Sequence, residues 1–353
     1  MIDNEQINTW YGTMSFDYNH CFLCGSQLSD DKKTVEHIFP KWLLKKHNLW
    51  NQTLSLPNKS LIKYRQLVIP CCTACNNEYL SGIENKVKSA FANGIGEVRG
   101  LEPTVLYQWF SKIFYGLMFK NLSLKASQHV NNDEKILNSD FLINHRFLFD
   151  CMQSIRLPIC LDKNHSSLFI FEVHKDLYSK TVGDFFYFDD LNYSTIILQS
   201  ENIGIVCCIG EHKAIEHKLE KYLDPFFSII LHPFQFRQLM ADIYYNRRLL
   251  RTGTSGLFTD NEIITLTPLS DLYDEYSQFE YAKCLYFFLK NNNPCFEFES
   301  LYSKEHDAVQ NFLLDSERRL IIYKSYSEYY FGQQHLGYSG KPLFDHKIRV
   351  DYP

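Results

Sequence analysis

Two Cys-x-x-Cys pairs constrain the fold of this chain most strongly. Cys21 and Cys24 form the first pair and Cys72 and Cys75 the second, with 47 residues between them. Each turn places two thiolates where they can share one tetrahedral ion, so two turns complete a four-cysteine zinc site. Because four thiolates leave no position for water, this zinc is expected to be structural. Cys71 is the spare thiol by its spacing; the alternatives are buried free cysteines or a redox pair.

The remaining composition describes an ordinary globular chain that keeps its thiols reduced. The chain has 353 residues, 45% hydrophobic and 22% charged, which predicts two domains. No apolar run reaches the roughly 18 residues that a membrane helix needs, and the polar, acidic start at Met1–Glu5 is unlike a signal peptide. We therefore expect a cytoplasmic protein without membrane contact, whose eleven cysteines bind metal or lie in the core.

An acidic residue followed by histidine lies between the two cysteine pairs and is the candidate for chemistry. A carboxylate such as Glu36 can bind a hard cation, while the adjacent His37 is left to take a proton from water. Asn76, directly after the second pair, offers a further oxygen ligand. A Glu-His dipeptide alone is a weak signal, and its position between two zinc turns makes it specific.

This stretch resembles the HNH endonucleases, the ββα-metal nucleases, in the subgroup with Glu-His-x-x-Pro-x-Trp-Leu and Cys-x-x-Cys-Asn-Asn. The likeness covers about residues 18 to 90, and the matching residues are Glu36, His37, Pro40, Trp42, Leu43, Cys72, Cys75, Asn76, Asn77, Ser81 and Glu84. The resemblance implies that Glu36 and Asn76 bind one catalytic divalent ion, Mg²⁺ or Mn²⁺. It also implies that His37 is the general base.

The sequence departs from the pattern of that family at one position. The family's middle asparagine corresponds to Leu67 here, so Gln66 or Arg65 is left to orient the loop that carries His37. Glu84 is more simply a surface or packing residue than a metal ligand. The missing asparagine motivates an alternative, a zinc module that binds nucleic acid or protein without cleaving it.

Charge is distributed unevenly along the chain. The net charge is −5, yet the segment from Lys32 to Arg65 carries a net charge of +7, which leaves −12 for the remainder. Its only acidic residue is Glu36, and its basic residues are Lys32, Lys33, Lys41, Lys45, Lys46, Lys59, Lys63 and Arg65. A basic patch around the proposed site suits a phosphate backbone, whereas a solvated lysine-rich surface is the plainer interpretation.

Periodicity predicts an α+β protein with a small N-terminal domain. The glycines between 94 and 100 suggest a boundary, giving an HNH domain over 1–98 and an α+β accessory domain of unknown role over 99–353. Within 1–98 we expect a short helix from Lys41, a strand over 61–70 and a helix over 76–91. Later helices are expected over 104–122, 236–250, 281–289 and 306–314, and strands over 167–173, 193–199 and 203–209.

The helix over 104–122 has an apolar stripe that Lys112 interrupts, with Lys112 expected on another face of the helix. The stripe runs through Leu106, Trp109, Phe110, Ile113, Phe114, Leu117 and Met118. Its plainest role is core or interface. An alternative makes it the docking surface of a nuclease subunit that a partner, such as an ATPase, controls.

The sequence thus predicts a metal-dependent endonuclease that hydrolyses phosphodiesters. Nucleic acid is the expected partner, with DNA favoured over RNA, and residues 99–353 are the expected region for a protein partner or self-association. Fusion of such a nuclease to an unlabelled domain is typical of antiviral defence effectors, an analogy at the level of fold only.

Overall fold

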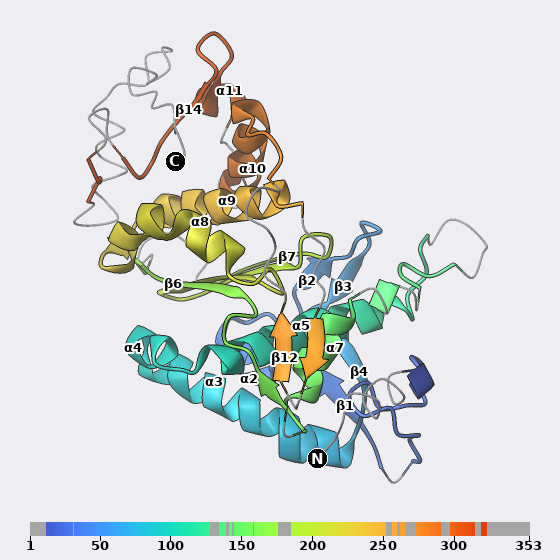
Figure 1. Cartoon of the computed structure of the whole chain (residues 1–353). Coiled ribbons are helices and arrows are strands. Elements are labelled where there is room, and N and C mark those ends of the chain that lie inside the picture. Colours follow the sequence, from blue (N-terminus) through green and yellow to red (C-terminus); the bar gives the residue numbers. More distant parts are fainter. Residues whose placement is uncertain are drawn as a thin grey trace. The chain divides into compact units, whose positions relative to one another are not determined.

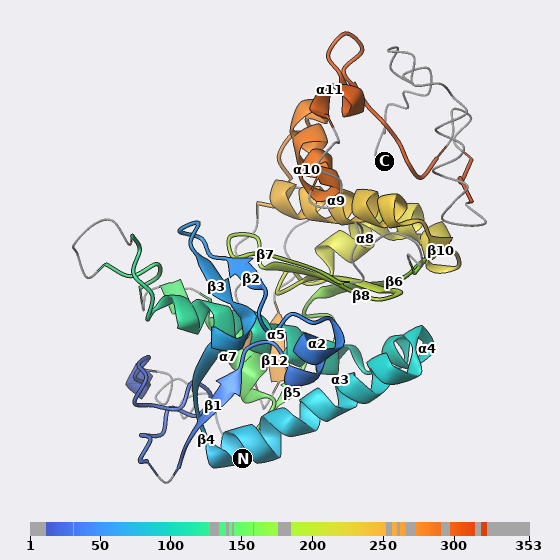
Figure 2. The same cartoon turned by 180° about the vertical axis from the view of Figure 1, so that it is seen from behind.

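A computed structural model of the chain contains two compact units (Figures 1 and 2). Unit 1 comprises Met1–Ser166, Ile209–His212 and Gly253–Thr267, and unit 2 comprises Ser167–Cys208, Lys213–Thr252 and Pro268–Pro353. The structure describes residues 12–30, 32–127, 134–138, 141–142, 145–157, 159–175, 185–251, 256–259, 262–265, 273–290, 297–314 and 319–322. The chain passes between the units several times, and together they make a mixed α+β protein, as predicted.

Unit 1 begins with two paired strands and a helix. Strand β1 (Lys33–His37) pairs antiparallel with β4 (Val68–Cys72), so that Glu36 lies opposite Ile69. The chain then enters a π-helical segment η2 (Cys75–Leu80) and continues directly into α3 (Ser81–Asn93). The expected helix over 76–91 is therefore confirmed, with a π-helical first part.

The segment between β1 and β4 folds into short elements of its own. It contains α2 (Lys41–Lys46), the antiparallel strands β2 (Thr53–Ser55) and β3 (Leu61–Lys63), and a 3-10 turn η1 (Tyr64–Gln66). The expected single strand over 61–70 is thus two strands with a turn between them. The helix expected from Lys41 is confirmed.

Helix α5 (Pro103–Asn121) is the central helix of unit 1. Pro103 opens it, where the missing N–H costs nothing. Its apolar stripe is buried: a Cβ on Gly116 would lie 3.2 Å from the Ile38 side chain and 3.3 Å from that of Ile69. The boundary predicted after residue 98 therefore falls inside unit 1, because α5 packs on α3 and β4. The fully buried Trp109 is not available as a docking surface.

Two further helices and a small sheet complete unit 1. Helix α4 (Ile95–Arg99) follows α3 after Gly94, whose φ of 101° ends that helix. Helix α7 (Arg146–Gln153) packs on α5. The three-stranded sheet has the order β11–β12–β5, with bounds Gly256–Thr259, Glu262–Thr265 and Cys160–Leu161.

Unit 2 is built on a five-stranded sheet with the order β10–β6–β9–β8–β7. The strands are β6 (Ser167–Val173), β7 (Phe185–Asp190), β8 (Thr195–Ser200), β9 (Ile203–Cys208) and β10 (Ile230–Leu231). All neighbours are antiparallel except β10 and β6. The expected strands β6, β8 and β9 are confirmed. A tight turn joins the last two, where Ser200 lies opposite Ile203.

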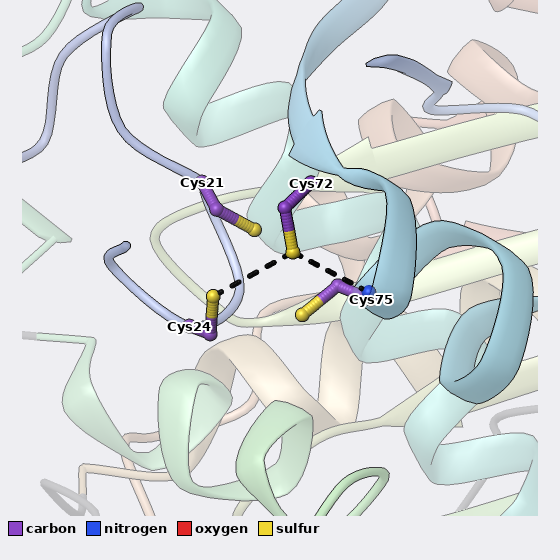
Figure 3. Close-up of side chains that lie close together, drawn as sticks. All are labelled: Cys21, Cys24, Cys72 and Cys75. Carbon is purple, nitrogen blue, oxygen red and sulfur yellow. Dashed lines mark hydrogen bonds between the residues drawn. The ribbon is translucent and has the colours of Figure 1, made fainter. Parts of the chain in front are cut away.

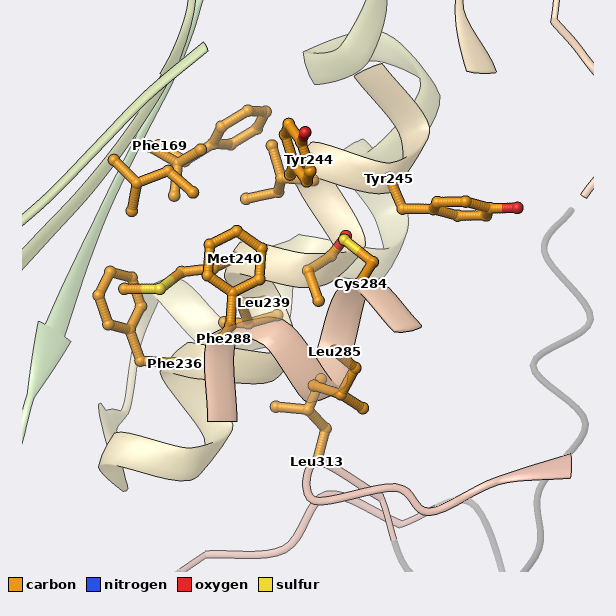
Figure 4. Close-up of a cluster of buried hydrophobic side chains, with 14 of the residues drawn as sticks. Phe169, Phe236, Leu239, Met240, Tyr244, Tyr245, Cys284, Leu285, Phe288 and Leu313 are labelled. Atoms are coloured by element: carbon orange, nitrogen blue, oxygen red, sulfur yellow. The ribbon is translucent and has the colours of Figure 1, made fainter. Parts of the chain in front are cut away.

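Helices pack on this sheet and form a large aromatic core (Figure 4). Helix α9 (Pro233–Leu249) is buried almost along its whole length, and α10 (Gln278–Lys290) packs against it. Gly204 of β9 is required here, because a Cβ would lie 2.3 Å from the ring of Phe236. Both helices match the expected ranges to within a few residues. Helix α8 (Ala214–Leu223) and the 3-10 turn η3 (Asp224–Phe227) both precede α9 in the chain.

The helix expected over 306–314 is wrong. After α11 (Phe298–Leu301), the strands β13 (Tyr302–Ser303) and β14 (Ala308–Val309) form a hairpin, and no helix follows in the part of 308–322 that is described. The Asn311 side chain accepts the N–H groups of Leu313 and Leu314, and Gln238 accepts that of Phe312. Side chains therefore replace the carbonyl acceptors of a helix. Among the described helices, none has the length and apolar character to cross a bilayer.

Candidate metal centre and the adjoining polar site

The four predicted cysteines come together (Figure 3). The Sγ atoms of Cys21, Cys24, Cys72 and Cys75 all lie within 4.8 Å of one another, and those of Cys24 and Cys72 are 3.8 Å apart. Tetrahedral zinc with Zn–S bonds of about 2.3 Å requires sulfur separations of about 3.8 Å. The geometry and the four soft ligands therefore fit zinc, and this is the one such group in the described ranges.

The backbone shapes both zinc turns. In the first, the N–H of Gly25 donates to the Cys21 carbonyl at 2.8 Å, and Gly25 has a φ of 71° that favours glycine. In the second, the Cys75 N–H points at Cys72 Sγ, 3.4 Å away, because Cys75 opens the π-helical segment (Figure 3). Strand β4 and the π-helical segment η2 thus bring the second pair to the first.

The end of helix α7 supports the first turn. The Gln153 amide donates to the Leu23 carbonyl at 2.8 Å, and Arg156 donates to Gln153 at 2.7 Å. Burial lowers the pKa of Arg156, while the nearby thiols oppose that shift. Its positive charge therefore counters the thiolates of a loaded site. Cys71 is fully buried with its sulfur 4.0 Å from that of Cys21, outside the four-cysteine group, as the spacing predicted.

The second cluster is a buried ion triad centred on Lys112. This lysine of α5 is 2% exposed and pairs with the carboxylates of Glu36 and Glu84, at 2.7 Å for Glu84. Burial would lower the pKa of Lys112, but the two carboxylates together hold it above its ordinary value. One ammonium against two carboxylates leaves an excess negative charge, which favours a further cation nearby.

Lys112 also holds the main chain where β1 ends. Its ammonium donates to the carbonyls of His37, at 2.6 Å, and of Ile38, at 3.2 Å. The Ile38 N–H in turn donates to the Leu67 carbonyl at 2.9 Å. Leu67, at the family's asparagine position, thus contributes through its backbone, and the polar contact to the loop comes from Lys112.

Neither residue suggested for orienting that loop has this role in its described contacts. Gln66 accepts the N–H of Lys63 at 3.3 Å, and Arg65 donates to Asn51 Oδ1 at 2.8 Å. Lys112, expected on a face of the helix outside the apolar stripe, is enclosed. Glu84 is half-buried and is its ion partner.

His37 lies on the other face of β1 from Glu36, because successive strand residues alternate. Both ring nitrogens are covered and make no hydrogen bond among the described residues. Burial lowers the pKa of His37 to about 4, with Lys41 and Lys112 adding to the shift. The imidazole is therefore neutral at pH 7. Its ring lies against Trp50, with the two centroids 5.5 Å apart.

Asn76 contacts the same strand from the start of the helical segment. Its Nδ2 donates to Thr34 Oγ1 at 3.1 Å and to the Val35 carbonyl at 3.4 Å. Thr34 and Glu36 share a face of β1 by alternation, so Asn76 approaches the face that carries the carboxylate. Its Oδ1 makes no hydrogen bond in the described part of the chain and remains available as an oxygen ligand.

The predicted basic surface is exposed. All eight lysines and arginines between Lys32 and Arg65 are solvent-exposed. Lys41 is close enough to affect the pKa of His37, and Arg65 is fixed on Asn51, the neighbour of Trp50. The positive charge of Lys41 therefore lies near the imidazole, and that of Arg65 lies near the residue that follows Trp50.

Sequence reasoning missed the role of the Lys112–Glu84 pair. The signal that could have found it is a lysine at the centre of a helix that is otherwise apolar for several turns. Lysine is almost never fully buried unless it is paired, so such a position predicts acidic partners. No family model matches this chain, and no match was found among the curated proteins or the solved structures.

Proposed function

We propose that this protein is a metal-dependent endonuclease of the HNH type, with DNA as its favoured substrate. His37 acts as the general base and Glu36 and Asn76 as ligands of a divalent ion. The four-cysteine zinc anchors the strand and helix that carry these residues. The role is consistent with an antiviral defence effector, which is an analogy from domain organisation alone.

The single observation that carries the proposal is the state of His37. Its imidazole is neutral, lacks a hydrogen-bond partner among the described residues, and is fixed at the end of a strand whose carbonyls Lys112 binds. A covered polar group without a partner is costly, and directly after Glu36 in the chain it makes His37 a candidate for a functional role. A neutral imidazole can accept the proton of an attacking water.

Glu36 and Asn76 are suited to Mg²⁺ or Mn²⁺ more than to zinc. Both offer oxygen, and Mg²⁺ commonly binds through one or two protein oxygens together with substrate phosphate. When bound, such an ion stabilises the negative charge that develops on the phosphate and the leaving oxygen. Lys112 orients the Glu36 carboxylate by a direct ion pair, and Asn76 is oriented by Thr34.

The test is a cleavage assay with purified full-length protein on plasmid DNA, single-stranded DNA and single-stranded RNA. Each substrate is incubated with Mg²⁺, with Mn²⁺, or with EDTA added just before the substrate. We expect cleavage that requires the divalent ion and leaves the zinc content unchanged during the assay. Equal cleavage in all metal conditions, or none on any substrate, contradicts the proposal.

A second candidate function is a module that binds nucleic acid without cleaving it. It is favoured by the ion pair of Glu36 with Lys112, because a carboxylate already neutralised by a lysine attracts a metal less strongly. This candidate predicts binding that weakens with salt. Neutralising Lys45, Lys46 and Lys63 together should reduce the slope of log affinity against log salt concentration by up to about three. It is distinguished from the first by the absence of products at every metal concentration.

A further inference from the structure

Trp50 is the exposed aromatic residue beside the proposed base. It lies in the turn that follows α2, with 37% of its surface exposed, and its ring is tilted by 36° against that of His37. Val35, 54% exposed, projects from the same face of β1 as His37. An apolar, partly open surface therefore borders the imidazole in the middle of a basic region.

The groups around Trp50 are complementary to a nucleotide. Asn51 directly follows Trp50 in the chain, and its Oδ1 accepts a 2.8 Å hydrogen bond from Arg65. Thr53 lies three residues after Trp50, and Lys63 lies opposite Thr53 in the β2–β3 pair. Guanidinium and ammonium groups suit phosphates, and an exposed indole suits the flat surface of a base.

We propose that Trp50 is a stacking platform for one unpaired nucleobase next to the scissile phosphate. The inference rests on the proposed nuclease function and adds a substrate class, single-stranded or locally unpaired nucleic acid. The bases of an intact duplex are stacked on each other and cannot reach an indole on the protein surface.

The plainer role for Trp50 is to shield His37 from water. That role accounts for the depressed basicity of His37 but predicts no preference between strand states. It also predicts that the indole itself stays in one environment when nucleic acid binds. The two roles therefore differ in measurements that do not require cleavage.

The experiment measures binding of fluorescein-labelled 12-nucleotide single strands, as DNA and as RNA, and of the matching DNA duplex. All proteins are full-length and carry His37→Ala, and the divalent ion is left out, so that substrate is not consumed. Trp50→Ala is compared with Trp50→Phe and with Phe279→Ala, a control aromatic of unit 2 that is 41% exposed.

We expect Trp50→Ala to weaken single-strand affinity by about 5- to 150-fold, the range for loss of one stacked base, and duplex affinity by less than about 2-fold. Trp50→Phe should retain most of the single-strand affinity, and Phe279→Ala should retain all of it. Indole fluorescence should be quenched by single strands, and Trp50→Phe should abolish that quenching.

Equal losses on single strand and duplex, or no loss on either, overturn the inference while leaving the proposed nuclease intact. If the parent protein binds none of the three probes, the proposed function fails first and the inference fails with it. A preference for RNA over DNA single strands would support the stacking site and change the favoured substrate.

Discussion

The two units differ in the buried charged and polar groups that they contain. In unit 1, a lysine is enclosed between two carboxylates, four thiols converge on one point, and His37 is covered without a hydrogen-bond partner among the described residues. In unit 2, Asp242 accepts the hydroxyls of Tyr222 at 2.6 Å and Tyr281 at 2.5 Å. Those contacts join residues 20 and 39 positions apart and lie beside a continuous apolar core.

Reactive and charged groups lie at the centre of unit 1, whereas apolar packing dominates unit 2. Unit 1 contains a four-cysteine group that can hold a metal and a buried ion triad, so we expect its stability to be sensitive to chelation and to single charge changes. Unit 2 depends on apolar burial, which single substitutions reduce by small steps. Hydrogen exchange followed by mass spectrometry on the full-length protein reads the two units separately, through peptides of α5 and of α9.

The largest expected effect is the loss of zinc. Cys72→Ala should remove a site whose binding free energy is folding free energy, on the order of 10 kcal/mol. Peptides of unit 1 should then exchange fast, while those of α9 stay protected. Cys71→Ala is the matched control one residue away, and it should retain one zinc per chain. Well-protected unit 1 peptides in zinc-free Cys72→Ala would contradict the metal account.

The next effect concerns the ion triad. Lys112→Met leaves the buried Glu36 and the half-buried Glu84 without their cation and should cost about 3–5 kcal/mol of unfolding free energy. Adding Glu36→Gln and Glu84→Gln to that variant removes the unpaired charge and should recover part of the loss. Urea unfolding monitored by exchange in α5 measures both. A triple variant less stable than Lys112→Met would show that the triad is not the cause.

Both units should lose stability in the acidic range, and a buried histidine contributes to that loss in each. Burial lowers the pKa of His165 in unit 1 to about 4 and that of His232 in unit 2 to about 3. Because the folded state favours the neutral form, this stability is complete above pH 6.5 and is lost as pH falls from 6.5 towards 4. About 3 kcal/mol is expected for His165. His165→Gln should flatten the pH dependence in unit 1 peptides and leave it unchanged in α9.

The smallest expected effect is in unit 2. Tyr281→Phe removes one of the two hydroxyls that Asp242 accepts and should cost about 1–2 kcal/mol, because Tyr222 still serves the carboxylate. Thermal unfolding of the α9 region measures this loss of stability. Tyr222→Phe alone should cost a similar amount, and the double variant should cost more than the sum. An additive double variant would show that the two hydroxyls do not share one acceptor.

The sequence predicted what local spacing determines. The Cys-x-x-Cys turns, the short helix at Lys41 and the long apolar helix followed from spacing and periodicity, and the zinc ligands come together as expected. The 306–314 prediction failed because the Asn311 and Gln238 side chains take the backbone donors there.

The parts that were missed depend on contacts between distant residues. Lys112 is 76 positions after Glu36, and no periodicity connects a lysine in one helix to a carboxylate in a strand. Unit 1 continues past the glycines between 94 and 100 for the same reason, because α5, which follows them, packs on β4, which precedes them. Chain order carries little information on such long-range ion pairs and packing.

The central claim is that His37 is the base of a nuclease, and the most direct measurement is turnover of His37→Ala. Full-length wild type, His37→Ala and the control His217→Ala, an exposed histidine of α8, are compared with Mn²⁺ at equal zinc content. We predict a loss of roughly 10² to 10⁴-fold for His37→Ala and none for His217→Ala. Because the pKa of His37 is near 4, kcat/KM of the wild type should hold down to about pH 5. Wild-type turnover by His37→Ala, in a preparation free of contaminating nuclease, would contradict the claim.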